Sequence, residues 1–301
     1  MSGVKSHGVG KIASLNLGDM SASPDFEQHG PVLRVNGNGM SGLRLFRVVA
    51  DRVVPMVRQY GVAIAGAVNF TRYSSLYPYT EKIAKAGYVS IMINSAGPPA
   101  VAPFGSYDPI TGTNPLCISI PSAGTVQTFD MTTAEVVWGE IRQAELEGRP
   151  LRGSTFYSVF GEFTTDPNEV HSVMSFGGAR GFAINLAIEM FCGPLLGAPG
   201  GLSVKGELDC GALLLAIDPG KMGAKDDFGS RIASLLGEVR AASPLRGSDE
   251  VRAPGDRNRG RILIEDHLRE TFDIADSTVS FLERMGRGEK IAELSSNPKF
   301  N

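Results

Sequence analysis

The stretch that decides the fold is Ile93–Asp130, which reads INSAGPPAVAPFGSYDPITGTNPLCISIPSAGTVQTFD. It is rich in Gly and Pro, carries almost no charge, and lies between two strand-like runs, Val89–Ile93 and Leu116–Ile120. Long irregular loops inside compact domains are usually functional or disordered, and the flanking strands argue against disorder. Two interpretations stay open: a buried structural loop, or a loop that lines a ligand site. In the second, the polar groups facing the ligand are Asn94, Ser95, Thr113 and Asn114.

Composition excludes several classes of function. The chain has 301 residues and a formal net charge of -3, so it has no basic excess that would favour nucleic acid or an anionic membrane. Its apolar runs are interrupted by Gly and polar residues, and none is expected to span a membrane. The four His show no metal-ligand spacing, so no metal site is predicted. Cys117, Cys192 and Cys210 lie in apolar runs, which is typical of core thiols in a reducing cytoplasm.

Working outward from the loop, strand-like and helix-like segments alternate, which predicts a three-layer α/β core. Residues 62–225 are expected to form the sheet core that binds the ligand, and residues 1–61 with 226–301 a peripheral, largely helical lobe. The dinucleotide fingerprint G-x-G-x-x-G is missing. The expected strands are Val32–Val35, Val62–Val68, Tyr88–Ile93, Leu116–Ile120, Thr125–Phe129 and Ala212–Ile217; the expected helices are Leu43–Tyr60, Tyr77–Ala86, Asp130–Leu146, Phe182–Cys192 and Phe228–Arg240.

Two segments have the features of an anion site at a helix start. Asp130–Thr133 follows a strand and is expected to open a helix, whose free N–H groups suit a phosphate or a carboxamide. Phe176–Gly181, FGGARG, runs into an apolar helix, and Arg180 adds a fixed charge there. A third segment, 253–261, has an arginine-rich sequence that fits a solvated loop or a phosphate grip.

These segments occur in an order that resembles the malate/L-lactate dehydrogenase family, of the sulfolactate-dehydrogenase-like fold. The resemblance implies an α/β fold with a mixed, non-Rossmann sheet and peripheral helices from both chain ends. It also implies a homodimer that binds NADH or NADPH and reduces a 2-oxo acid or cyclic 2-imino acid, a small carboxylate. The matching motifs are SHGV at Ser6–Val9, NSAGPPAVAPFG at 94–105, GTNP at 112–115, FDMTT at 129–133, TTDP at 164–167, FGGARG at 176–181 and APGD at 253–256.

The resemblance also implies roles for single residues. His7 would be the catalytic proton donor, and Ser6 would hydrogen-bond the same substrate oxygen. Arg72 and Ser158 stand where the family has a His and an Asp. The residues expected to bind substrate are Lys11, Arg72, Thr113 and Asn114; those expected to bind the cofactor are Ser95, Asp130, Met131, Thr132, Arg180, Gly255, Asp256 and Arg257.

Two further functions stay open at this point. The chain could keep the family's cleft for non-redox chemistry, with Arg72 or Lys11 binding a new anionic substrate. It could also be a binding protein without catalysis, because a fold does not fix a function. Titration with a nicotinamide dinucleotide distinguishes these alternatives from a reductase.

Overall fold

The computed structural model describes residues 22–71, 73, 75–224 and 226–256. Their centre is a mixed seven-stranded sheet in the order β1-β2-β3-β9-β4-β5-β6. Strands β2 and β3 are parallel and the other neighbouring pairs are antiparallel. The seven strands are β1 Asp25–His29, β2 Val32–Ser41, β3 Val62–Thr71, β4 Val89–Asn94, β5 Leu116–Ser122, β6 Thr125–Met131 and β9 Gly211–Ile217.

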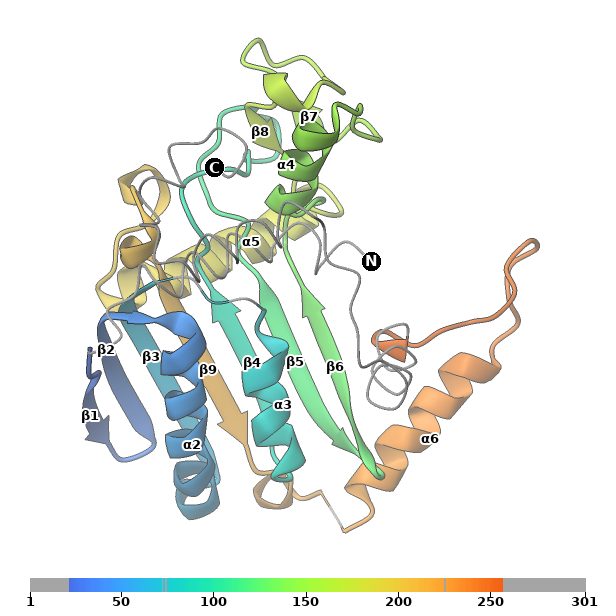
Figure 1. Ribbon diagram of the computed structural model, residues 1–301. Helices are drawn as coiled ribbons and strands as arrows, with labels where there is room; N and C mark the ends of the chain where they lie inside the picture. Colours follow the sequence, from blue (N-terminus) through green and yellow to red (C-terminus); the bar gives the residue numbers. More distant parts are fainter. Residues whose placement is uncertain (1–21, 72, 74, 225, 257–301) are drawn as a thin grey trace, which may run out of the picture.

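Helices lie on both sides of the sheet (Figure 1). Helices α2 and α3 lie on the near face of the sheet. Helix α5 runs behind the sheet, near the upper ends of the strands. A small sheet of β7 (Phe156–Tyr157) and β8 (Ser172–Val173) lies with α4 above the large sheet. The helices are α2 Gly42–Tyr60, α3 Tyr77–Lys85, α4 Trp138–Glu147, α5 Ala179–Cys192 and α6 Phe228–Ala241, with 3-10 turns at Pro167–Glu169, Pro194–Leu196, Gly201–Ser203, Glu207–Asp209 and Gly220–Met222.

The main core lies between α2 and the near face of the sheet. The apolar stripe predicted for this helix is buried, including Phe46 and Val53. On β3 the residues that face α2 are Ala63, Ala65 and Ala67, all buried. Alanines let the helix approach the sheet closely, so bulky side chains of α2 fill the space between them. A second, smaller core under α4 contains Phe156 and Val173.

The structure corrects the sequence prediction around β6. The helix expected to open at Asp130 begins at Trp138, and β6 continues through Met131. Pairing of Met131 with Leu116 of β5 extends the strand, because ladder hydrogen bonds along the hairpin outweigh the local N-cap signal of the threonines. The predicted hairpin of 116–120 with 125–129 is confirmed. Segment 1–61 contributes β1 and β2 to the sheet beside its helix.

Candidate functional site

A pocket of about 190 Å³ lies between the loop after β4, the small sheet and the start of α5. Three aromatic side chains are among its lining residues, none of which carries a charge. Phe163 stacks on the Tyr157 ring, with centroids 5.1 Å apart, and so supports one wall. The lining residues are Ala102, Pro103, Phe104, Gly105, Tyr157, Met174, Ser175, Gly178 and Phe182.

The start of α5 forms one side of this pocket. Gly178 is the N-cap, its φ is 64°, and no side chain caps the first amides of the helix. A Cβ on Gly181 would lie 1.7 Å from the Phe176 carbonyl oxygen, so only glycine permits this tight entry. Uncapped N–H groups at a helix start favour an anion. Arg180, exposed in the first turn, adds a positive charge to the same end.

A buried hydroxyl lines the pocket without a partner. Ser175 is 5% exposed, and its Oγ has no hydrogen-bond partner among the described residues. A buried polar group without a partner is destabilising, and such groups are rare in native proteins. An oxygen or nitrogen of a bound ligand would satisfy it.

Residues 130–132, which are predicted to bind the cofactor, lie at the end of β6 and lead toward the same pocket. Asp130 and Met131 are exposed at the end of this edge strand. The following turn is fixed by Thr132, whose hydroxyl donates to the Thr113 carbonyl at 2.6 Å. A β-bridge between Ala134 and Ser175 then places the segment beside the pocket wall. The structure therefore brings the β6 end and the α5 start together.

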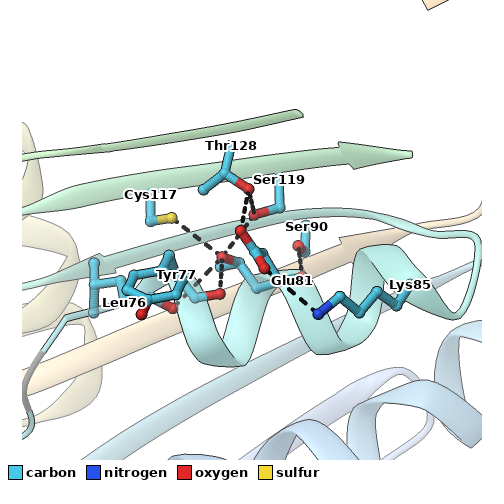
Figure 2. Close-up of polar contacts among 9 residues, drawn as sticks. Leu76, Tyr77, Glu81, Lys85, Ser90, Cys117, Ser119 and Thr128 are labelled. Atoms are coloured by element: carbon cyan, nitrogen blue, oxygen red, sulfur yellow. Dashed lines mark hydrogen bonds and ion pairs between the residues drawn. The ribbon is translucent and has the colours of Figure 1, made fainter. Parts of the chain in front are cut away.

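A buried polar cluster on α3 fixes the strand that carries Asp130 (Figure 2). The hydroxyl of Ser119 lies 2.8 Å from that of Thr80 and 3.1 Å from that of Thr128. Thr128 also contacts Glu81 at 3.0 Å. These contacts hold β5 and β6 against α3 in one register.

The amino end of α3 meets Asp130 directly. The Tyr77 amide donates to the Asp130 carboxylate at 3.2 Å. Burial raises the pKa of the Tyr77 phenol, and the nearby charges of Glu81 and Asp130 raise it further. An acidic group at a helix N-terminus is favourable, so this contact holds Asp130 at the end of β6.

A second buried network joins α5 to the long loop between β4 and β5, residues 95–115, which we call the organising loop. Asn114 is fully buried; its Nδ2 donates to Glu189 Oε2 at 2.7 Å and its Oδ1 accepts from the Ala96 amide at 3.1 Å. Asn185 donates to the Gly112 carbonyl at 2.9 Å and to the Thr133 hydroxyl at 2.9 Å. The side chain of Asn114 is thus engaged in holding the loop.

The other predicted cofactor residues lie at two places. Ser95 is buried beyond the end of β4, where its hydroxyl accepts from the Gly211 amide at 3.0 Å. Gly255 passes the edge of β6, since a Cβ there would lie 3.0 Å from the Thr128 carbonyl oxygen. Next to it, Asp256 makes a two-point ion pair with Arg240, at 2.7 and 2.9 Å. Gly255 therefore lies along β6, the strand that carries Asp130, and Asp256 follows it directly.

Five predicted site residues lie outside the described residues, and their roles stay predictions: Ser6, His7, Lys11, Arg72 and Arg257. Sequence reasoning missed Ser175, Asn185 and Glu189. The last two had a signal, because two polar residues four apart in an apolar helix share one face. Ser158, at the position where the resemblance predicts an Asp, directly follows Tyr157 of the pocket wall and is 8% exposed.

The mixed seven-stranded sheet defines the class of the protein: it has an α/β fold that is not of the Rossmann type. The profile of the malate/L-lactate dehydrogenase family matches residues 1–283. The chain therefore belongs to the malate/L-lactate dehydrogenase family, and it is an oxidoreductase.

Curated relatives and solved structures agree with this. The chain is 32% identical to malate/(S)-sulfolactate dehydrogenase of Methanothermus fervidus, covering 87% of this chain and 80% of that protein. It is 32% identical to the Δ1-pyrroline-2-carboxylate/Δ1-piperideine-2-carboxylate reductase of Pseudomonas aeruginosa, covering 72% and 70%. A crystal structure of a dehydrogenase from Sinorhizobium meliloti is similar with a TM-score of 0.81 and 28% identity, covering 88% and 82%.

Proposed function

We propose that the protein uses NADH or NADPH to reduce a 2-oxo acid or a cyclic 2-imino acid. The observation that carries the proposal is the meeting of the exposed β6 end with the uncapped start of α5 at one pocket. Family membership and relatives named as dehydrogenases and reductases support the reaction type.

The described residues fit a dinucleotide beside this pocket. The exposed carboxylate of Asp130 is of the type that accepts hydrogen bonds from ribose hydroxyls. Arg180, exposed in the first turn of α5, suits a phosphate of the dinucleotide. The first amides of α5 and the unpaired hydroxyl of Ser175, which lie at the pocket itself, suit the substrate carboxylate. The reduced dinucleotide, when bound, supplies a hydride to the carbonyl or imine carbon, and a proton completes the product.

The remaining roles rest on the family resemblance. His7 donates the proton and Ser6 holds the substrate oxygen, while Lys11 and Arg72 offer positive charge to the substrate carboxylate. Thr113 and Asn114 act on the substrate side through the loop that they fix. Arg257 joins Gly255 and Asp256 on the cofactor side. The protein works in the cytoplasm, which suits its three buried, unpaired cysteines.

The test is oxidation of NADH and NADPH, followed by absorbance, with 2-oxo acids and Δ1-piperideine-2-carboxylate. We expect turnover with at least one acid and a higher KM for the dinucleotide in Asp130→Asn. Glu238→Gln, an exposed acid on α6, is the matched control and leaves KM unchanged. A chain that binds neither dinucleotide in a fluorescence titration would refute the reductase and favour a repurposed cleft.

We further propose that the protein is a homodimer joined through α5. The residues on the outer side of this helix and of the turns after it expose large apolar side chains. Together they present on the order of 500 Å², which is as large as the largest apolar patch of a typical monomer, often a functional one, and is a large share of the roughly 800 Å² that each partner contributes to a standard interface. The residues, 41% to 61% exposed, are Ile184, Met190, Phe191, Leu195 and Leu202.

The far face of the sheet below α5 continues this apolar surface. Ile64, Leu215, Ile91 and Ile118 pair in one row across four strands and are only half-buried. An uncharged surface can pair with a copy of itself without repulsion, as a two-fold interface requires.

Segment Ala179–Leu196 is also, by length and composition alone, apolar enough to cross a membrane, and 33% of it is buried.

Light scattering after gel filtration tests the dimer. We expect a dimer mass for the native chain and a monomer mass for Met190→Glu. Leu245→Glu, at a loop position with 82% exposure, is the control and stays dimeric. A monomer mass for the native chain, or sedimentation with phosphatidylcholine vesicles that Met190→Glu abolishes, would contradict the proposal.

A further inference from the structure

The walls of the pocket at the start of α5 affect which acids the protein binds, provided that the proposed function holds. Phe104, Tyr157 and Phe182 surround the space with apolar rings, and Met174 adds a flexible apolar side chain. No lining residue is charged. Burying an anionic group against such walls without a counter-charge carries a large desolvation penalty, whereas burying an apolar group is favourable.

One end of the pocket differs from the walls. There the uncapped start of α5, with Gly178 as N-cap, lies beside the unpaired Oγ of Ser175. The helix start favours a negative charge, and the buried hydroxyl can donate one hydrogen bond to it. These two groups together suit a single carboxylate.

The volume fits a small acid of this kind. An apolar cavity of about 150 Å³ holds a benzene ring. The pocket, at about 190 Å³, therefore has room for a ring or a branched chain with little more than a carboxylate attached.

The rim of the pocket is apolar as well. Phe104 is 66% exposed and lies over the helix start, 3.5 Å from where a Cβ of Gly178 would be. Val159, Phe160 and Phe163, in the loop that follows Tyr157, are 57%, 82% and 58% exposed. Phe104 lines the pocket and Phe163 stacks on its Tyr157 ring, so at least these two exposed apolar side chains lie beside it. Exposed apolar side chains beside a pocket are typical of a binding surface, and they favour apolar over doubly charged ligands.

We propose that this pocket receives the substrate side chain, and that the enzyme prefers 2-oxo or cyclic 2-imino acids with an uncharged, apolar side chain over acids that carry a second anion. The α5 start and Ser175 hold the carboxylate, and Phe182 with Tyr157 contacts the side chain. This specificity rests on the proposed reduction but concerns only binding in the pocket.

Two acids of nearly the same size test the preference. In 5-methyl-2-oxohexanoate an uncharged isopropyl group takes the place of the second carboxylate of 2-oxoglutarate. We measure Kd for each acid by calorimetry, with and without NADPH, and kcat/KM by NADPH oxidation. The expected result is at least tenfold tighter binding and a higher kcat/KM for the branched acid.

Three variants assign the preference to the pocket. Phe182→Ala should reduce the ratio of the two Kd values at least threefold, and Phe182→Leu should retain most of it. Ser175→Ala should weaken both acids by the same factor, because it acts on the shared carboxylate. Phe228→Ala, at the half-buried first residue of α6, is the control and leaves the ratio unchanged. Thermal unfolding confirms that each variant is folded.

The outcomes separate this inference from the proposed function. Reduction of both acids with 2-oxoglutarate preferred would overturn the specificity and leave the reductase intact. Discrimination in Kd without any NADPH or NADH oxidation would support the pocket and contradict the reductase. Equal Kd values, no binding of either acid, or a ratio that Phe182→Ala does not change would overturn the inference.

Discussion

Glu189 is the residue whose removal should disturb the fold around the site most clearly. It lies within α5 and is 5% exposed. Its two carboxylate oxygens accept separate hydrogen bonds, from Asn114 Nδ2 at 2.7 Å and from the Gly201 amide at 2.8 Å. Glu189→Ala would remove both acceptors at once. The Gly201 amide would lose its partner, and one of the two N–H groups of the buried Asn114 amide would be left unsatisfied, while the other still donates to the Asn185 carbonyl at 3.1 Å.

The expected loss of folding free energy in Glu189→Ala can be worked out from these two donors. A buried donor left without a partner is destabilising by about 1–3 kcal/mol, so two give roughly 2–6 kcal/mol. Removing the carboxylate also removes its own desolvation penalty, which moves the total toward the lower half of that range. We expect a loss of about 3 kcal/mol, and at about 2–4 °C per kcal/mol Tm falls by about 6–12 °C. Glu189→Gln keeps one acceptor and should lose about half as much.

Urea unfolding and calorimetry measure this loss, with Glu238→Ala as the matched control. Glu238 is exposed on α6, so its removal should change stability by less than about 0.5 kcal/mol. If Glu189→Ala unfolded with the same midpoint as Glu238→Ala, the buried network would not stabilise the loop. Equal losses for the Ala and Gln variants would show that the second acceptor contributes nothing.

Three further predictions concern other parts of the chain. Gly181→Ala should destabilise by at least about 3 kcal/mol in urea unfolding because its Cβ meets the Phe176 carbonyl at 1.7 Å, whereas Gly237→Ala, in open space on α6, should stabilise slightly. Burial raises the pKa of the Cys117 and Cys192 thiols to about 12, so a disulfide reagent at pH 8 should label neither before unfolding. Unfolded thiols ionise from about pH 8.5, so stability should fall as pH rises through the window up to those folded values. Arg240→Ala should change stability by no more than about 1 kcal/mol, since its pair with Asp256 is partly exposed, but should raise the Kd for NADPH if Gly255 and Asp256 hold the cofactor; an unchanged Kd would contradict that role.

Most of the fold could be predicted from periodicity. The stripe of α2 and the alternation in β5 and β6 are long, regular patterns, and the structure confirms both elements. The start of α4 could not be predicted in this way. Asp130 and the threonines after it have the residue types of a helix cap, but β6 pairs with β5 through Met131 and so continues the sheet. Strand pairing is a tertiary interaction, so a short stretch of sequence considered alone does not reveal it.

The candidate site was less accessible to sequence reasoning. FGGARG was correctly associated with a helix start, because glycines before an apolar run are a local signal. Ser175 precedes that motif and shows nothing unusual in sequence; its significance comes from burial without a partner. The aromatic walls come from three separate segments, around Phe104, Tyr157 and Phe182, which only the folded chain brings together.

The organising loop can be both structural and functional, because its two ends have different surroundings. At the end of the loop nearest β5, the side-chain amide of Asn114 donates to Glu189 and to the Asn185 carbonyl, and it accepts from the Ala96 amide; these bonds fix the backbone. The outer residues of the loop, from Ala102 to Gly105, line the pocket. Because one end of the loop is locked by buried hydrogen bonds, the other end can present an exposed Phe104 at a defined place without forming a core of its own. The two interpretations of the loop are therefore two ends of one segment, and a variant such as Glu189→Ala should weaken ligand binding through the first end while leaving every pocket side chain unchanged.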